Sequence, residues 1–153
     1  MNVVIMGCGR VGSTVAARLA NEGHTVSIVD TDSFAFSRLP EDFDGRCVVG
    51  SGNDLRILEE VGIRDADAFI ALASGDNRNI LASQRAKHVF AVKTVVTRVK
   101  DPQRSKIFSA LGLRTFSPTT IGAELAHDAL FAEAPAEASG SSPNGAEPSG
   151  AEA

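Results

Sequence analysis

The chain has 153 residues, which is enough for one domain with a proper core but not for a cofactor domain beside a separate substrate domain. Its formal net charge of −4 comes from four Glu in residues 132–153, so the remaining 15 acidic residues balance the 15 basic ones. A neutral body that has no Trp, no Tyr and no Lys/Arg cluster excludes a typical nucleic-acid-binding protein.

Short β-branched runs alternate with helical patterns along the chain, and this alternation predicts a parallel sheet with helices on both faces. Strands are predicted at 2–6, 25–30, 46–49, 68–73, 94–99 and 114–117, and helices at 11–22, 34–39, 54–61, 78–87, 103–111 and 120–131. Right-handed crossovers and a glycine motif after the first strand indicate an α/β fold. We therefore expect a Rossmann-like doubly wound parallel sheet of six strands in the order 3-2-1-4-5-6.

The composition changes abruptly after Phe131 to Ala, Glu, Pro, Ser, Gly and one Asn. Such a segment has no side chain larger than Ala with which to bury apolar surface, so it cannot offset the entropy of ordering. We expect residues 1–131 to form a nucleotide-binding domain and residues 132–153 to form a disordered tail. A linker to a further segment is equally compatible with this composition.

The cysteine count and the hydropathy pattern indicate where the chain works. Cys8 and Cys47 are too few for a disulfide framework, and they are interpreted as small apolar residues in a reducing compartment. No apolar run approaches the ~18 residues of a membrane span, and no leader peptide is evident at the start. We expect a soluble, cytoplasmic chain that reaches the inner face of a membrane only through a partner.

A GxGxxG motif directly follows the first predicted strand and opens the first predicted helix. Its residues are Gly7, Cys8, Gly9, Arg10, Val11 and Gly12. In this context Gly7 permits the sharp turn, Gly9 lets the backbone approach a pyrophosphate, and Gly12 allows close packing of helix on strand. Free amides at the helix start, aided by the helix dipole, can then bind the phosphates.

Asp30 ends the second predicted strand, where a carboxylate accepts hydrogen bonds from the hydroxyls of an adenosine ribose. A 2′-phosphate there meets a negative charge, and Thr31 and Asp32 supply no Arg to receive it. The pattern therefore disfavours NADP. It leaves NAD, ATP, ADP and AMP open.

The loops after strands three, four and five are expected to complete the site, because ligands of doubly wound sheets lie beyond the carboxyl ends of the strands. Ser51 lies in a loop of small residues that leaves room for adenine or serves only as a turn with a helix cap. Ala73 and Ser74 follow strand four. Arg98, near the end of strand five, needs an anionic partner, which is either a phosphate or a carboxylate such as Asp101.

The sequence resembles the N-terminal domain of the TrkA/KtrA family, also called the RCK (regulator of potassium conductance) or KTN domain. The resemblance covers residues 1–131, and its segments are 4–12, 49–54 with Leu58 and 61–63, 66–68 with 75–79, and 97–99 with 101–102. It implies a cytoplasmic regulatory subunit that binds NAD(H) or ATP/ADP and gates a membrane potassium channel or transporter subunit of the Trk/Ktr type. It also implies nucleotide contacts from residues 7–11, Asp30, Ala73, Ser74 and Arg98.

The chain departs from the family pattern in two ways. Many relatives have an acidic or amide residue where Ser51 stands, so the contact that such a residue makes to the base is not expected from this position in the same form. Full-length family members continue into a second ligand-sensing domain, so we expect a shortened subunit that forms homo-oligomers or pairs with a longer homologue.

Two other functions are considered beside a regulatory one. An NAD-dependent oxidoreductase is disfavoured because the chain has no Tyr for a Tyr/Lys proton relay, and His24, His88 and His127 are interpreted as surface or packing residues, so no enzyme activity is expected. A pure assembly module would use an apolar stripe on the last helix, although such a stripe more often belongs to a core. The stripe consists of Ile121, Leu125, Ala129 and Leu130.

Overall fold

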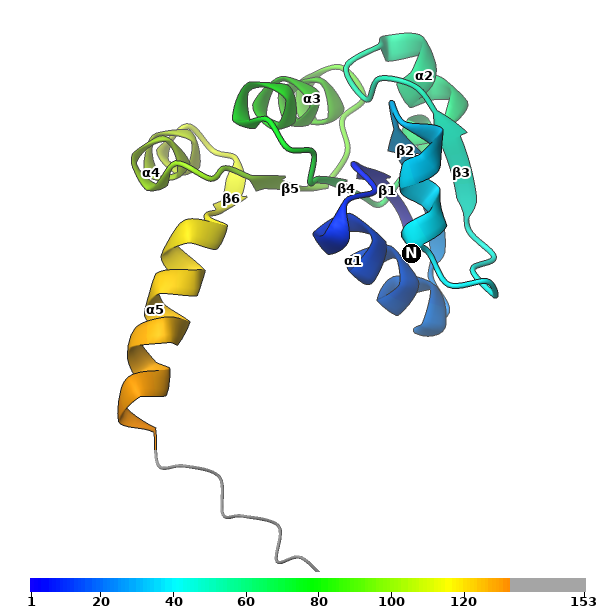
Figure 1. Cartoon of the computed structure of the whole chain (residues 1–153). Coiled ribbons are helices and arrows are strands. Elements are labelled where there is room, and N and C mark those ends of the chain that lie inside the picture. The colour runs from blue at the N-terminus through cyan, green and yellow to red at the C-terminus, as the bar shows by residue number, and fades with distance from the viewer. Residues whose placement is uncertain (133–153) are drawn as a thin grey trace, which may run out of the picture.

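A parallel sheet of six strands organises residues 1–132, the part of the chain that the computed structural model describes (Figure 1). The strands lie in the order β3-β2-β1-β4-β5-β6, and every neighbouring pair is parallel, so the predicted doubly wound topology is confirmed. Their bounds are β1 Asn2–Met6, β2 Thr25–Asp30, β3 Arg46–Val49, β4 Ala68–Ala71, β5 Thr94–Arg98 and β6 Arg114–Phe116. The predicted tail lies outside the described residues from position 133 onward.

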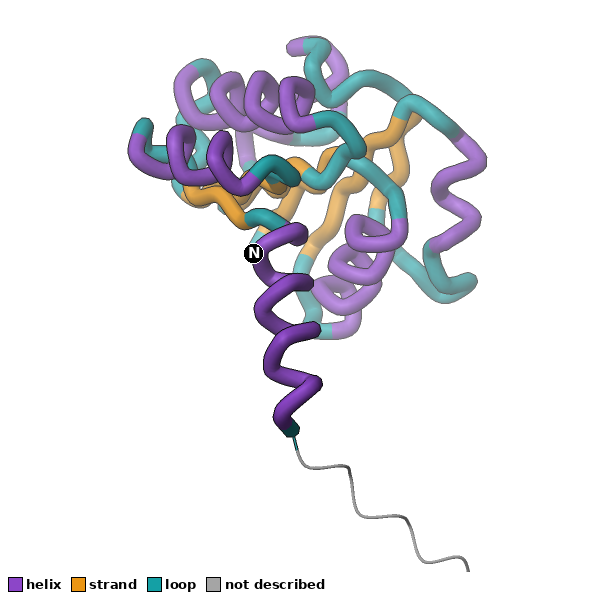
Figure 2. Tube along the Cα trace, turned by 60° about the vertical axis from the view of Figure 1, so that its left-hand side comes forward, coloured by secondary structure: helices purple, strands orange, loops and turns teal. Residues whose placement is uncertain are grey.

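Helices cover both faces of the sheet (Figures 1 and 2). Helix α1 and the 3-10 helix η1 pack on one face, and α2 and α3 pack on the other, as two separate clusters of buried side chains show. The bounds are α1 Arg10–Asn21, η1 Ser33–Arg38, α2 Leu55–Glu60, η2 Ile63–Asp65, α3 Asp76–His88, α4 Pro102–Ala110 and α5 Pro118–Phe131.

The central strand β1 contributes side chains to both clusters, which is why it is apolar on both faces. Val4 and Met6 pack under α2 and α3, whereas Val3 and Ile5 pack under α1. Cys8 is buried in the cluster under α1, as its interpretation as a small apolar residue predicts. Cys47 is exposed on β3, so that interpretation was wrong for this second cysteine.

Several predicted bounds differ from the observed ones. The helix predicted at 34–39 is the 3-10 helix η1, whose start is capped by Asp32 through a hydrogen bond from the Phe34 amide. Strand β4 ends at Ala71, and α3 begins two residues before the predicted start at 78 because Gly75 is its N-cap. The short 3-10 helix η2 was not predicted.

Hydrogen bonds from α3 join it to the strands beneath it and to the loop after β5. Asn79 is fully buried, and its Nδ2 donates to the carbonyls of Ala73 (2.9 Å) and Arg98 (3.0 Å). Asp76 accepts from the amides of Lys100 (2.9 Å) and Asp101 (3.2 Å). The start of α3 therefore holds the carboxyl ends of both β4 and β5 in place.

Helix α5 leaves the body of the molecule instead of packing on the sheet (Figures 1 and 2). None of its residues is buried, and Leu125 is 65% exposed. The more frequent interpretation of its apolar stripe as core was therefore wrong for the described chain. Ser117, which caps α5, donates from Oγ to the Lys100 carbonyl at 2.9 Å, so α5 is attached to the loop that Asp76 also holds.

Within residues 1–132, no helix combines the length and the apolar character that a membrane crossing requires.

Candidate functional site

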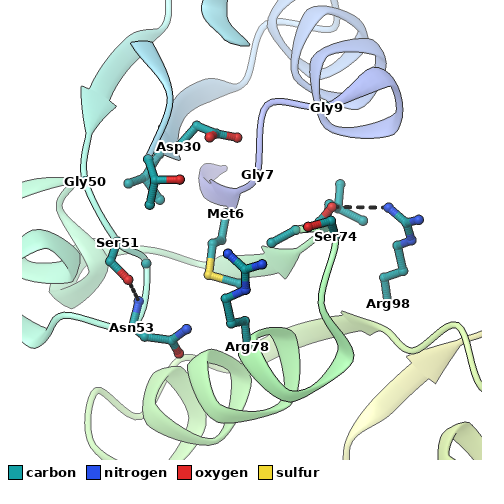
Figure 3. Close-up of a pocket in the computed structure, with 15 residues that line it drawn as sticks. Met6, Gly7, Gly9, Asp30, Gly50, Ser51, Asn53, Ser74, Arg78 and Arg98 are labelled. Atoms are coloured by element: carbon teal, nitrogen blue, oxygen red, sulfur yellow. Dashed lines mark hydrogen bonds between the residues drawn. The ribbon is translucent and has the colours of Figure 1, made fainter. Parts of the chain in front are cut away.

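A cavity of about 220 Å³ lies at the carboxyl ends of the central strands, where a doubly wound sheet binds its ligands (Figure 3). Fifteen residues line it, and they come from the ends of β1, β2 and β5, the loops after β1, β2, β3 and β4, and the start of α3. Seven of the eleven predicted site residues are among them: Gly7, Gly9, Asp30, Ser51, Ala73, Ser74 and Arg98.

The glycine loop has the geometry that its sequence predicts. Gly7 has φ +101°, and a Cβ placed there would lie 2.7 Å from the Ala73 nitrogen, so the loop packs tightly on the end of β4. A Cβ on Gly12 would lie 1.8 Å from the Gly7 carbonyl oxygen, which is the close packing of helix on strand. Around Gly9, by contrast, no atom lies within 4 Å of such a Cβ. The space beside Gly9 is therefore open to a ligand.

Four predicted residues of the motif do not line the cavity. Gly12 and Cys8 are buried behind the loop, and Arg10 and Val11 are exposed at the start of α1. Burial, and then the carboxylate of Asp30, raise the pKa of the Cys8 thiol to about 11, so the thiol stays protonated near neutral pH. Helix α1 has no side-chain cap and no acidic residue in its first turn. Its first amides are thus free to bind an anion.

Asp30 connects the end of β2 to the glycine loop. Its Oδ2 accepts a hydrogen bond from the Cys8 amide at 2.7 Å, and its Oδ1 accepts one from the Asp32 amide at 3.0 Å. These two bonds fix the carboxylate at the rim of the cavity (Figure 3). Each oxygen keeps a further lone pair, so the group can still accept hydrogen bonds from a sugar.

Arg98 reaches the cavity from the end of β5. Its Nη1 donates to the Leu72 carbonyl at 3.4 Å, and its buried Nε has no hydrogen-bond partner among the described residues. The carboxylate alternative does not hold, because Asp101 caps α4 through bonds from the amides of Gln103 and Arg104. A buried guanidinium nitrogen without an acceptor fits a site that binds an anion.

The loop after β3 contains a helix cap and also lines the cavity. Asp54 caps α2, and the hydrogen bond from the Arg56 amide holds the pKa of its carboxyl below the usual range. Ser51 lines the cavity, and its Oγ accepts from the Asn53 amide at 3.3 Å. Arg85 of α3 donates to the Asn53 carbonyl and so ties this loop to the neighbouring helix.

The sequence pattern did not single out several lining residues. The most important is Arg78, whose guanidinium lies in the cavity (Figure 3). The others include Met6, Val29 and Leu72, which are buried apolar residues at strand ends. The signal for Arg78 was its position just after the β4 loop, because the first turn of that helix must lie at the same edge of the sheet.

The three histidines lie outside the cavity. His24 contacts the amino terminus at 3.4 Å, His88 ends α3, and His127 lies on α5 beside Asp128. The ionisable side chains that line the cavity are Asp30, Arg78 and Arg98. This set is suited to binding a polar ligand with a phosphate and a sugar.

A family model described as the TrkA-N domain matches residues 3–118, which include the sheet and the whole cavity. The chain belongs to the TrkA-N domain family. The resemblance to the N-terminal domain of the TrkA/KtrA family, predicted from the sequence, is therefore confirmed.

A protein of Streptomyces coelicolor named "Trk system potassium uptake protein TrkA" is 48% identical to this TrkA-N domain over 115 residues. The matched part is 75% of this chain and 52% of that protein, so the chain spans about half the length of this relative.

Two solved structures share the fold. The Shewanella denitrificans Kef CTD in an AMP-bound form has a TM-score of 0.69 and 24% identity, over 86% of this chain and 80% of that one. The GsuK channel bound to NAD has a TM-score of 0.72 and 23% identity, over 85% of this chain and 23% of that one. At these identities the likeness shows the fold alone.

Proposed function

We propose that this TrkA-N domain binds an adenine nucleotide without a 2′-phosphate, either NAD(H) or ATP/ADP, and thereby regulates potassium uptake. The observation that carries the proposal is that the Asp30 carboxylate and the open backbone at Gly9 line the same cavity. A carboxylate for the ribose beside a glycine turn for the phosphates is the recognition pattern of a dinucleotide-binding fold.

The residues present fit such a ligand. The first amides of α1 and the open space beside Gly9 suit a diphosphate, and the orphaned Nε of Arg98 offers a further donor. The Asp30 carboxylate suits the ribose hydroxyls and repels a 2′-phosphate. The loop containing Ser51 and Asn53 then lies on the side left for the base.

The proposed partner is a membrane potassium channel or transporter subunit of the Trk type, at the cytoplasmic face of the membrane. The name of the S. coelicolor relative and the channel context of the GsuK neighbour support this partner. We further propose that residues 1–131 act as one nucleotide-binding unit and work as an oligomer, with copies of this chain or with a longer homologue. Regulation requires that competing nucleotides bind two arrangements with different affinities, because equal affinity shifts no population.

The role is one of binding rather than catalysis. The guanidinium groups of Arg78 and Arg98 are hydrogen-bond donors only, and Asp30 is engaged by two backbone amides. Neither the two arginines nor the Asp30 carboxylate is placed to act as a general base, and the three histidines lie outside the cavity. Incubation with NADH and a generic hydride acceptor is expected to give no turnover above background.

Calorimetric titration with NAD, NADH, ATP, ADP and NADP tests nucleotide binding. We expect NAD to bind more tightly than NADP, and the variant Asp30→Asn to lose most of this preference, because the charge that repels a 2′-phosphate is gone. Asn keeps an acceptor for the Cys8 amide, so the fold is retained. Asp42→Asn, an exposed matched control, leaves the ratio unchanged. Absence of binding by all five nucleotides would refute the proposal.

The regulatory role is tested by potassium uptake in bacteria that lack their own Trk regulatory subunit and express a Trk-type membrane subunit. We expect the wild-type chain to change the uptake rate and Asp30→Asn to change it less. Equal uptake with and without the chain would refute the regulatory role, while the proposal of nucleotide binding would still stand.

A further inference from the structure

Arg78 has a position that the fold alone does not explain. It is the third residue of α3, and a cation in the first turn of a helix opposes the helix dipole. Among the described residues it forms no ion pair, and its side chain lines the cavity. Arg78 is exposed at the cavity, so its guanidinium is available to an electron-rich ligand group, either a phosphate or the π-face of a base.

The two guanidinium groups lie at different ends of the cavity (Figure 3). Arg98 lies on the side of Ser74, across from Gly9, where the free amides of α1 begin. Arg78 lies beside Met6 and faces the loop that carries Ser51 and Asn53. The end with Arg98 therefore suits phosphates, and the end with Arg78 is left for the base.

The end of the cavity near Arg78 is built for a flat, apolar group. Its floor includes Met6, which lies beside Arg78 and is only 4% exposed (Figure 3). Its wall contains Gly52, where a Cβ would lie 2.4 Å from the Met6 side chain, so the backbone packs directly on that floor. A planar ring against this floor would present its other face to the cavity.

Gly75 gives Arg78 the room to fold toward the cavity. A Cβ on Gly75 would lie 3.1 Å from the Arg78 Nε, which is tighter than ordinary contact. The guanidinium thus passes close over the helix start, where the absence of a side chain on Gly75 leaves it space.

We propose that Arg78 recognises the adenine base by stacking its guanidinium on the ring, and that it is a specificity-determining residue and not a phosphate ligand. This inference rests on the proposed nucleotide-binding function and assigns the base end of that site. Arg78 and the apolar floor hold the two faces of the base, while Arg98 and α1 hold the phosphates.

The variants Arg78→Lys and Arg78→Ala test the proposal with adenosine, AMP, ADP and ATP as ligands. Lys keeps the charge but loses the plane, so it would preserve a phosphate contact and abolish a stack. We expect both variants to lose about three- to twentyfold in affinity, by the same factor for all four ligands. Losses that grow with the number of phosphates, or an unchanged affinity in Arg78→Lys, would overturn the proposal.

Matched controls separate this outcome from the failure of the site as a whole. Arg98→Ala, which removes the charge proposed for the phosphates, is expected to weaken ADP and ATP more than adenosine. Arg56→Lys, an exposed residue on α2, is expected to change nothing. If the wild-type chain binds none of the ligands, both proposals fail, whereas binding that Arg78→Lys leaves intact overturns only the stack.

Proton NMR gives a readout that does not depend on affinity. Adenosine is expected to shift the Cδ methylene protons of Arg78 upfield, because protons above a purine ring lie in its shielding region. A phosphate contact would instead shift the Arg78 Nε proton downfield on addition of ADP and leave the methylene signals in place with adenosine. The second pattern would contradict the proposal.

Discussion

Two glycines of one motif serve different purposes at the scale of single residues. Gly12 is held against the Gly7 carbonyl oxygen, so the absence of a side chain there is a requirement of packing. Gly9 has open space around it and φ −76°, a value that any residue adopts. The absence of a side chain at Gly9 is therefore not a requirement of packing, and it leaves the space that the proposed ligand would use.

Alanine at these two positions separates the two purposes. Gly12→Ala is expected to lower the free energy of unfolding by about 1–3 kcal/mol, because backbone atoms cannot move away cheaply. Gly9→Ala should stay within about 1 kcal/mol of wild type but lose about tenfold in nucleotide affinity, because the new methyl group occupies the open space. Chemical denaturation and calorimetric titration measure the two effects. A Gly9→Ala protein that binds normally would show that phosphates lie elsewhere.

Residue patterns predicted seven of the residues that line the cavity but not Arg78. Gly7 and Asp30 could be found because their roles follow from local backbone geometry at known points of a βαβ unit. Arg78 could not be assigned, since its direction depends on the contact with Gly75 and on where α3 begins. The carboxylate partner considered for Arg98 was wrong because Asp101 caps the following helix.

At the scale of elements, the start of α3 depends on a bond that no local pattern contains. Asp76 does not cap its own helix but accepts hydrogen bonds from the amides of Lys100 and Asp101, far along the chain. Burial raises the pKa of this carboxyl, but those two bonds and the charges of Arg104 and Lys100 outweigh it, so its pKa is lowered overall. The ionised form is therefore the one that stabilises the fold.

The variant Asp76→Asn tests this contribution through its pH dependence. A lowered folded pKa gives stability that is present above the unfolded value near 3.8 and is lost as the pH falls through the folded value. We expect a loss of about 1–2 kcal/mol at pH 7 and a smaller one at pH 3, measured by urea unfolding. Asp42→Asn, an exposed control, should be neutral at both pH values. An equal loss at pH 3 would show that the charge is not involved.

The alternation of strands and helices was sufficient to predict the sheet and its order, because connections between parallel strands have a fixed hand. Bounds were less certain where tertiary contacts decide them. Helix η1 is a 3-10 helix that follows the Asp32 cap, and α3 begins after Gly75 at Asp76, whose carboxylate contacts the β5 loop. Neither contact is visible in a hydrophobic period.

On the scale of the whole molecule, two large clusters of buried side chains, one on each face of the sheet, form most of the core, and a smaller third cluster surrounds Val99. Leu58 of α2 is fully buried in one of them, whereas Leu125 of α5 is 65% exposed. Both are apolar positions on helices, so the sequence alone did not distinguish them. The difference arises because α5 leaves the body after Ser117.

Alanine substitutions at Leu58 and Leu125 test this difference in burial. Leu58→Ala is expected to cost about 2–5 kcal/mol in the free energy of unfolding, because it leaves a cavity in the core. Leu125→Ala should cost less than about 0.5 kcal/mol. Thermal and urea unfolding at low protein concentration measure both. A comparable loss in Leu125→Ala would show that α5 packs against another surface in solution.

The attachment of α5 has a mechanical consequence. The first turn of α3, the backbone at Lys100 and the Ser117 cap are linked in series by hydrogen bonds, and α3 carries Arg78 at the cavity. Helix α5 has 14 residues, so it is about 21 Å long, and a tilt of about 10° at its base moves its far end by about 4 Å. The base of this helix is thus linked through Lys100 to the helix that carries Arg78, and any tilt at that base is largest at the far end of α5.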